Sequence, residues 1–222
     1  MISQLIWPRR KQILIDINTQ NDFLDAEGHR PVRHSRRVFL NIRRVFAWAR
    51  KKDIPVISLC LVHPNNNGCN EFDYCLDGTF GQKKVRFTLL QNRITYPADN
   101  NINLPADIFK KYQQVILHTR STDPFDEPRI ERILSEIESA NFILIGANID
   151  GCIKSVALGL LQRGKHVTVL SDGVGSWQSR EGKLALQKMK AKGAKLLETR
   201  KIAGSSSLRH INLFARKAVS KL

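Results

Sequence analysis

Short apolar runs rich in β-branched residues alternate along this chain with longer segments whose apolar residues recur at helical spacing. The run from Gln12 to Ile17 is apolar along most of its length, as in a strand that is buried on both faces. In residues 38–52, by contrast, Val38 and Ile42 share one stripe and arginines occupy the other, which predicts an amphipathic helix. The two periodicities together predict strands and helices in alternation.

The same criteria place the remaining elements. We expect further strands at residues 55–61, 114–117, 142–146, 166–170 and 195–199, and further helices at residues 128–140, 152–163 and 180–192. Gly164 suits a left-handed cap at the end of the second of these helices. Residues 62–105 form a long excursion, rich in Asn and Gly, with little periodicity. An excursion of that length inside a domain is usually functional or contains small local elements.

This alternation predicts an α/β fold: a three-layer α/β/α arrangement around a mostly parallel, six-stranded, Rossmann-like sheet. No internal repeat or linker divides the chain. We therefore expect one domain over residues 1–222, with its core at residues 13–200 and a basic C-terminal tail at residues 205–222. In open parallel sheets the functional site lies beyond the carboxyl ends of the strands, so candidate chemistry is sought there.

Charge is the unusual bulk property of the chain. Its 36 Lys and Arg against 20 Asp and Glu give a net charge of +16, which favours contact with anionic surfaces such as nucleic acid or an acidic protein. The alternative is that the charge is spread over solvated faces, because the sequence contains no recognised nucleic-acid-binding module. Nucleic acid stays open as a partner.

The apolar residues are distributed as in a protein that does not enter the membrane. No stretch approaches the roughly 18 consecutive apolar residues that a membrane span requires. The apolar patch within Met1–Arg10 is too short for the core of a signal peptide. We therefore expect no membrane association and a cytoplasmic location.

The four cysteines are too few and too scattered for a disulfide scaffold, and they lack the paired spacing of a structural zinc site. Cys152 differs from Cys60, Cys69 and Cys75 in opening a predicted helix. The unpaired N–H groups at a helix N-terminus stabilise a thiolate and could also hold an oxyanion. Because a thiol is also a common packing residue, the spacing alone is compatible with either role.

Polar residues also follow two other predicted strands. Asp16 ends the first strand and precedes the run Asn18–Phe23, while His118 and Arg120 end the third. A carboxylate near a cysteine can act as its general base, and a nearby cation would lower the pKa of the thiol. Together with Cys152, these side chains make up the candidate constellation.

Three segments add a more specific signal. Residues 13–23, ILIDINTQNDF, have an aspartate at the end of a strand ahead of a Gln-Asn-Asp-Phe motif. Residues 143–173 contain a cysteine six residues after the glycine that ends a strand, and residues 75–81 read CLDGTFG. The three segments occur in the order found in the isochorismatase-like cysteine hydrolase family, which the chain resembles from residue 13 to about residue 200. The CLDGTFG segment is similar to an element of the nicotinamidase-related branch.

The resemblance implies a role for each matching residue. Asp16 falls on the catalytic aspartate, which activates the cysteine or relays its proton, and Cys152 falls on the nucleophile that attacks an amide carbonyl to form a thioester. Ala147–Asn148 falls where the family has a non-proline cis peptide bond that directs an N–H into the oxyanion hole. We take Phe23 and Arg120 as candidate residues of the substrate pocket. The resemblance also implies a homo-oligomer.

The sequence departs from the family at its catalytic lysine, which ends the third strand. Strand register places His118 on that position, whereas counting back from Phe125 places Thr119 there. We take His118 as the third catalytic candidate, because it could supply a proton or a partial positive charge. Arg120 could supply a permanent charge, but neither side chain reproduces an ammonium group.

A second departure concerns the metal site of nicotinamidase-like members, which consists of one aspartate and two histidines. Of these three ligands this sequence keeps only His63, since Leu61 and Asn67 occupy the other two positions. One histidine does not hold a catalytic zinc ion, which generally needs three protein ligands. We therefore expect no metal and no cofactor.

Two functions from different classes follow, and whether the chain is an enzyme stays open. The first is a cysteine hydrolase that cleaves a C–N bond of a small-molecule amide or imide, and the presence of both Cys152 and Asp16 favours it. The second is a catalytically degraded member, a pseudoenzyme whose basic surface and tail bind RNA, a ribonucleoprotein or an acidic protein. The missing lysine and the net charge of +16 favour the second.

Overall fold

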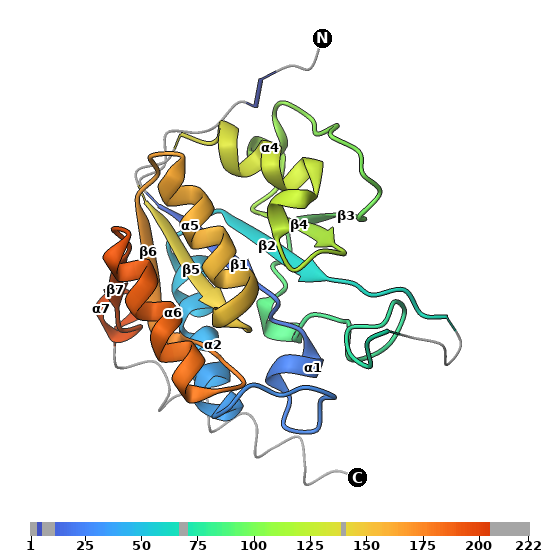
Figure 1. Ribbon diagram of the computed structural model, residues 1–222. Helices are drawn as coiled ribbons and strands as arrows, with labels where there is room; N and C mark the ends of the chain where they lie inside the picture. Colours follow the sequence, from blue (N-terminus) through green and yellow to red (C-terminus); the bar gives the residue numbers. More distant parts are fainter. Residues whose placement is uncertain (1–3, 6–11, 67–70, 139–140, 205–222) are drawn as a thin grey trace, which may run out of the picture.

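The computed structural model describes residues 4–5, 12–66, 71–138 and 141–204, and its strands and helices alternate along the chain (Figure 1). The strands are β1 (Ile13–Ile17), β2 (Val56–Leu61), β3 (Arg93–Tyr96), β4 (Gln114–Thr119), β5 (Phe142–Gly146), β6 (Val167–Val174) and β7 (Lys195–Leu197). The α-helices are α1 (Asn21–Leu24), α2 (Ser35–Lys51), α3 (Ile108–Lys111), α4 (Pro128–Glu136), α5 (Lys154–Gln162), α6 (Ser179–Ala191) and α7 (Arg200–Ala203). Two 3-10 turns, η1 (Arg86–Thr88) and η2 (Pro124–Asp126), and a π turn, η3 (Ile149–Ile153), complete the described elements.

A parallel sheet forms the middle layer. In the described residues it has seven strands in the order β3-β4-β2-β1-β5-β6-β7, and each pair of neighbours is parallel. The predicted α/β class with a parallel sheet is confirmed, but the predicted number of six strands is corrected to seven. The added strand, β3, lies at the sheet edge within the long excursion. Its four residues alternate between exposed and half-buried, a pattern too short and too polar to predict a strand.

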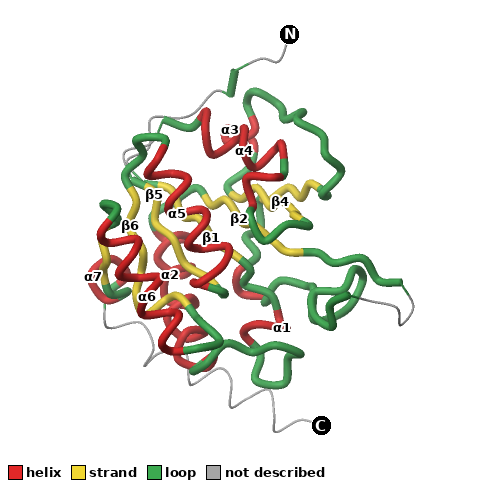
Figure 2. The backbone as a smooth tube through the Cα atoms, in the orientation of Figure 1, coloured by secondary structure: helices red, strands yellow, loops and turns green. Residues whose placement is uncertain are grey.

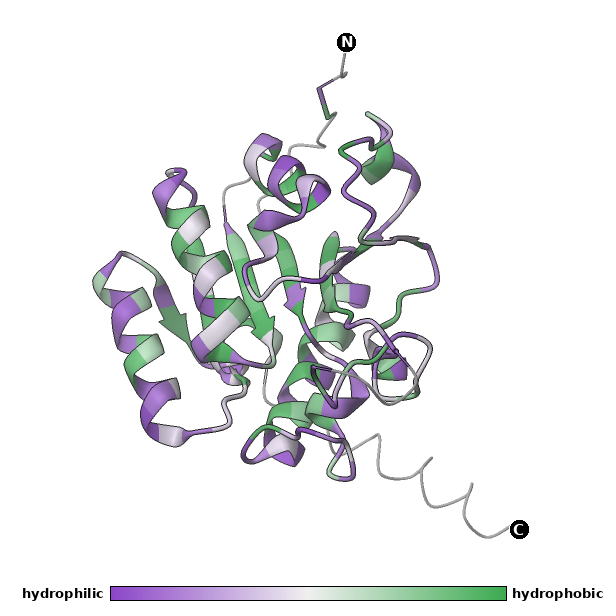
Figure 3. Cartoon of the chain, turned by 45° about the vertical axis from the view of Figure 1, so that its right-hand side comes forward, coloured by the Kyte–Doolittle hydropathy of each residue, from purple (hydrophilic) through white to green (hydrophobic). Residues whose placement is uncertain are grey.

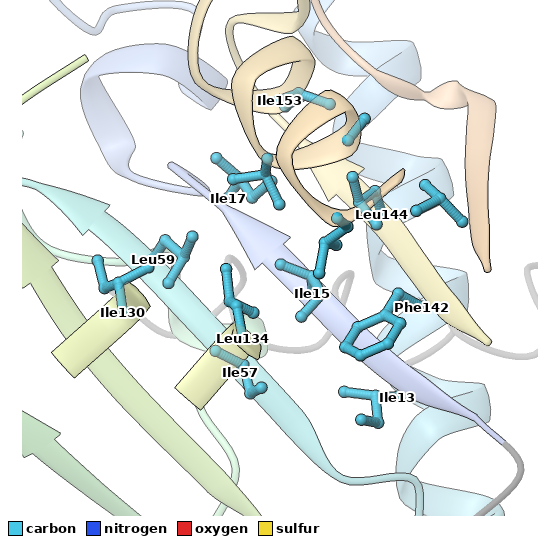
Figure 4. Close-up of a cluster of buried hydrophobic side chains, with 14 of the residues drawn as sticks. Ile13, Ile15, Ile17, Ile57, Leu59, Ile130, Leu134, Phe142, Leu144 and Ile153 are labelled. Atoms are coloured by element: carbon cyan, nitrogen blue, oxygen red, sulfur yellow. The ribbon is translucent and has the colours of Figure 1, made fainter. Parts of the chain in front are cut away.

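Helices cover both faces of the sheet, and the apolar residues concentrate between the layers (Figure 3). The larger buried cluster lies between the sheet and α4, α5 and α6, and it contains Ile13, Ile15 and Ile17 of β1 (Figure 4). The second cluster contains Leu14 of β1 and the buried apolar residues of α2. Successive strand residues therefore point to opposite helix layers, as the pleat requires. None of the helices in the described part of the chain is long and apolar enough to cross a membrane.

Several predicted boundaries shift where the chain turns. The helix expected at residues 152–163 begins instead as the π turn η3 and continues as α5. Gly164 follows α5 with φ of 70°, so the predicted left-handed cap is confirmed. The expected basic tail, residues 205–222, lies outside the described residues.

The strand order places the candidate site. β1 lies between β2 and β5, and β4 lies on the far side of β2. The carboxyl ends of these four strands therefore share one edge of the sheet, from which the long excursion after β2 extends mostly as loop (Figure 2). Residues that follow β1 are enclosed by the two neighbouring strands and by this excursion.

One tight contact at this edge yields a test of the fold. Gly146 ends β5 with φ of 137°, and a Cβ there would stand 1.8 Å from the carbonyl oxygen of Ile17. We expect Gly146→Ala to lower the free energy of unfolding by about 3 kcal/mol or more, because the backbone must move. Gly164→Ala is the control: its φ is also positive but its Cβ would meet open space, so the loss should be about 1 kcal/mol. Urea denaturation measures both, and equal losses would contradict the prediction.

Candidate active site

The polar motif that follows β1 fastens the excursion to the sheet. The Gln20 side-chain amide donates to the carbonyl oxygen of Gln82 at 2.7 Å, and a backbone bridge joins Gln20 to Lys84. One oxygen of Asp22 accepts from the backbone N–H of Cys75 at 2.6 Å. The motif therefore fixes where the excursion crosses the carboxyl end of β1, which brings Lys84 to that strand.

Lys84 supplies a cation that the sequence did not reveal. Its Nζ lies 2.5 Å from Oδ2 of Asp16 and 2.6 Å from the hydroxyl of Thr19, and its side chain is only 5% exposed. The hydroxyl of Ser58, on β2, donates to the same Oδ2 at 2.8 Å. The other oxygen of Asp16, Oδ1, is buried and has no hydrogen-bond partner among the described residues. Oδ1 is therefore the atom of this carboxylate that is available to accept a proton.

Cys60 and His118 lie opposite each other on β2 and β4, near this ion pair. Burial raises the pKa of the Cys60 thiol to about 11, while the charge of Lys84 lowers it and that of Asp16 raises it. Burial lowers the pKa of His118, with Asp77 opposing this shift and Lys84 adding to it. The imidazole is therefore mostly neutral at pH 7 and does not replace the family lysine as a cation. We call Asp16, Lys84, Cys60 and His118 the ion-pair group.

Cys152 lies in a different setting, fully buried in η3 beside Asn18. Burial raises the pKa of the Cys152 thiol to about 11, whereas the Asn18 side chain and the N–H of Cys152 itself favour the thiolate. Oδ1 of Asn18 accepts from the N–H of Leu61 at 3.2 Å, whereas its NH₂ is buried and has no hydrogen-bond partner within normal distance among the described residues, so its effect on the thiol is that of a nearby dipole. The immediate neighbour of the thiol is thus an amide, and Asn18 appeared in the sequence only as one member of a polar run.

An aromatic cluster occupies the neighbouring space. The ring of Phe23 lies 5.6 Å from that of Tyr74 and 5.9 Å from that of Trp177, and the guanidinium of Arg30 stands over both of the latter rings. Tyr74 is close enough to Cys152 for a charged sulfur to raise the pKa of the phenol, although burial is the larger cause. Phe23, predicted as a pocket residue, is fully buried in this cluster and packs as a core residue.

The predicted oxyanion segment differs from what the resemblance implied. The peptide bonds of the described residues are all trans, so the cis bond expected at Ala147–Asn148 is wrong for this chain. The N–H of Ala147 donates to the carbonyl of Ile17 at 2.9 Å, which uses that group within the sheet. The chain turns instead at Asn148, in the left-handed region, ahead of Gly151, where a Cβ would stand 2.5 Å from the Asn148 side chain.

The residues at the end of β4 do not supply a buried cation. Thr119 is buried, and its hydroxyl accepts from the N–H of Ser121 at 3.2 Å. Arg120 is exposed, and its charge is among the influences that lower the pKa of Glu127, although burial raises that pKa overall. Of the predicted residues, Asp16 and His118 therefore belong to the ion-pair group, Cys152 lies with Asn18, and Arg120 lies at the surface.

The remaining part of the family's metal motif does not fit a zinc centre. His63 is buried and its ring stacks on Phe72 with centroids 4.0 Å apart. Leu61, at the position of the carboxylate ligand, is a buried apolar residue. No group of three or more His, Cys, Asp or Glu in the described ranges is arranged to hold a metal ion. No step of the chemistry is therefore derived through a metal.

The buried thiol after β5 and the carboxylate–ammonium pair after β1 both lie at the carboxyl ends of the parallel strands of an α/β protein. The model of the isochorismatase domain matches residues 12–201. The chain therefore belongs to the isochorismatase family, as the three sequence segments indicated.

Solved structures of the same fold extend this comparison. The chain is similar to an isochorismatase-like hydrolase from Alkaliphilus metalliredigens (18% identity, TM-score 0.67, covering 87% of this chain and 98% of that one). It is similar to the pyrazinamidase of Pyrococcus horikoshii, solved with zinc (20% identity, TM-score 0.65, 85% and 99%). It is also similar to the MAR1 ribonuclease of Caenorhabditis elegans (17% identity, TM-score 0.59, 96% and 94%). At these identities the likeness shows a common fold. Comparison with curated proteins gives no match.

The thiol pKa values predict how the cysteines react. With a pKa of about 11, only about one Cys152 in 10⁴ is a thiolate at pH 7, and this fraction rises about tenfold per pH unit. We expect alkylation of Cys152 by iodoacetamide to follow that slope between pH 7 and 10, as measured by peptide mass spectrometry. Asn18→Leu should slow labelling of Cys152 but not of Cys60. Labelling of Cys152 at pH 7 as fast as in urea-unfolded protein would refute the assignment.

The buried ion pair predicts a non-additive stability effect. Lys84→Met leaves Asp16 buried without its cation, so the free energy of unfolding should fall by about 3–5 kcal/mol. The double variant Asp16→Asn/Lys84→Met removes both charges and should lose less than Lys84→Met alone. Lys83→Met, at the exposed neighbouring position, is the control and should change stability by less than about 0.5 kcal/mol. If Lys84→Met behaves like Lys83→Met in urea denaturation, the pair does not form.

Proposed function

We propose that this protein is a cysteine hydrolase that cleaves the C–N bond of a small amide or imide, with Cys152 as the nucleophile. The observation that carries the proposal is the buried Asp16–Lys84 pair. It provides the carboxylate and the ammonium group that accompany the cysteine in the family, although Lys84 comes from the excursion and not from the end of β4. The likeness in fold to a protein named as a pyrazinamidase supports amide cleavage.

In this reaction the Cys152 sulfur attacks the amide carbon and the thiol proton leaves for Oδ1 of Asp16. Because the thiol has a pKa of about 11, its proton must depart as the S–C bond forms. Asp16 is not among the groups that influence the Cys152 thiol, so we propose that the proton reaches Asp16 through water. Lys84 and Ser58 occupy Oδ2, which makes Oδ1 the atom that carries the proton.

The second half of the reaction returns the enzyme to its starting state. The proton on Asp16 passes to the leaving nitrogen as the C–N bond breaks, and a thioester remains on Cys152. Water then attacks the thioester carbon, gives one proton back to the sulfur and releases the carboxylic acid. The N–H of Cys152 favours negative charge at the sulfur, and we propose it as a donor to the oxyanion.

A second candidate is a family member without hydrolase activity that serves as a binding or scaffold protein. The surroundings of Cys152 favour it: the thiol is fully buried, and its neighbour Asn18 is neutral. The charged groups gather around Cys60 instead. The homo-oligomer, the single domain and the cytoplasmic location remain predictions, of which the first is checked by light scattering on the purified chain.

A matched pair of cysteine variants tests the proposal. Ammonia release from small primary amides and N-carbamoyl compounds, and ring opening of cyclic imides, are measured for Cys152→Ser and Cys60→Ser. We expect Cys152→Ser to lose about 10³-fold or more in kcat/KM and Cys60→Ser to change it less than about threefold. Asp16→Asn should lose about 10²-fold, as expected for a missing general base.

The same assay separates the alternatives. Turnover that is abolished in Cys60→Ser but kept in Cys152→Ser would move the nucleophile into the ion-pair group and overturn the role of Cys152. If the unmodified protein turns over no substrate faster than the Cys152→Ser variant does, the non-catalytic candidate is supported. Unfolding curves of each variant confirm that the comparison is made on folded protein.

A further inference from the structure

A cavity of about 450 Å³ lies on the face of the sheet opposite α5 and α6, between the strands β2, β3 and β4 and the segment 80–89. Cys60, Lys84 and His118 of the ion-pair group are among the described residues that line it, whereas Cys152 is not. No acidic residue lines it either in the described part of the chain. The residues that matter for its chemistry are Phe80, Lys83, Arg86, Arg93 and Thr95.

The cavity holds several uncompensated positive charges. Lys83 and Arg86 are exposed and make no side-chain hydrogen bond or ion pair with any described residue. Arg93 donates to the carbonyl oxygen of Leu90 at 2.7 Å, a neutral partner that leaves its charge intact. Lys84 also lines the cavity, but Asp16 neutralises it. Three cations therefore face one small volume, which is an arrangement for binding an anion.

The segment that carries Lys83 and Arg86 forms one wall of the cavity and is held in place by contacts from β4 and from α2. Gln114, buried in β4, donates to the carbonyl of Thr88 at 2.8 Å and accepts from the N–H of Leu90 at 2.7 Å. Arg50 of α2 donates to the carbonyls of Phe87 and Leu89. The segment is therefore a preformed wall, and a ligand would not have to order it.

Phe80 adds an aromatic surface at the rim. Its side chain is 70% exposed, yet its backbone is fixed, because its carbonyl accepts from the Asn21 side chain at 2.9 Å and from the N–H of Lys83 at 3.1 Å. On its other side Phe80 borders a separate cavity lined by carboxylates, including Asp25 and Asp73. An anion near the Phe80 ring is therefore repelled by these carboxylates and attracted to the cavity lined by Lys83, Arg86 and Arg93.

We propose that this cavity binds a phosphorylated nucleoside unit. Lys83, Arg86 and Arg93 hold the phosphate, and Phe80 stacks on the base. The combination of a basic groove with an exposed aromatic ring is the one that single-stranded nucleic acids use, and the volume suits one nucleotide. The site borders the ion-pair group but does not use Cys152, and binding to it can be measured without hydrolase activity. A free nucleotide and a nucleotide within single-stranded RNA present the same chemistry.

The experiment measures binding of a fluorescent octa-adenylate RNA by anisotropy at several salt concentrations, and displacement by AMP. Lys83→Ala/Arg86→Ala should weaken binding of both ligands about tenfold or more and reduce the salt slope for RNA by about 1.4. Phe80→Ala should weaken binding about tenfold with the slope unchanged, because stacking is not a counterion effect. The control, Lys188→Ala/Lys190→Ala, removes the same charge from exposed positions of α6 on the opposite face and should change affinity less than twofold.

The outcomes are distinct. RNA binding much tighter than AMP binding, with both lost in the cavity variants, supports the site and makes an RNA strand its ligand. Comparable affinities, lost in the same variants, support it with a free nucleotide as the ligand. An equal loss in the α6 control, an unchanged Phe80→Ala variant or an absence of binding at low salt overturns the proposal. Unfolding curves verify that each variant is folded.

Discussion

The buried pair between Asp16 and Lys84 is the interaction on which the site depends. Removing a carboxylate and an ammonium group from water is costly, and the cost is offset only where the remaining hydrogen-bonding capacity is well used. Ser58 and Thr19 meet part of that requirement, whereas Oδ1 of Asp16 has no partner among the described residues. The segment that carries Lys84 must therefore cross β1 at one place. The other residues of that segment are fixed in position as a result.

Two groups of side chains arise from this constraint. Lys84 brings the excursion against β2 and β4, so Cys60 and His118 share the environment of the ion pair. Cys152 approaches from the turn after β5, on the far side of β1, and meets Asn18. The chain thus contains a thiol, a carboxylate and an ammonium group, but the two charged groups lie near Cys60 while Cys152 lies beside a neutral amide, so both the catalytic and the non-catalytic candidate find support.

The sequence predicts the interior better than the edges. β1 and β5 lie between other strands and bury every residue, so their unbroken apolar runs identify them. β3 has four residues at a sheet edge and alternates in exposure, so nothing in its composition marks it as a strand. Cys152 was found because it follows a clear strand. Lys84 was missed because its partner lies 68 residues away in the chain and no periodicity in the excursion indicates which lysine turns inward.

The fastening of the excursion also bears on how the chain reaches its native state. Residues 75–90 are tied to Asp16, Gln20 and Asp22 before them and to Gln114 after them, over separations of 24 to 68 residues. Contacts of this range form only after long loops have closed, which slows folding. The pairing of β1 with β5 joins Ile13 to Phe142 and closes a longer loop still, so the ties of the excursion can form before the sheet is complete. In a ribosome-bound chain the ties to Asp16, Gln20 and Asp22 can form once residue 84 has emerged, whereas the tie to Gln114 must wait for β4.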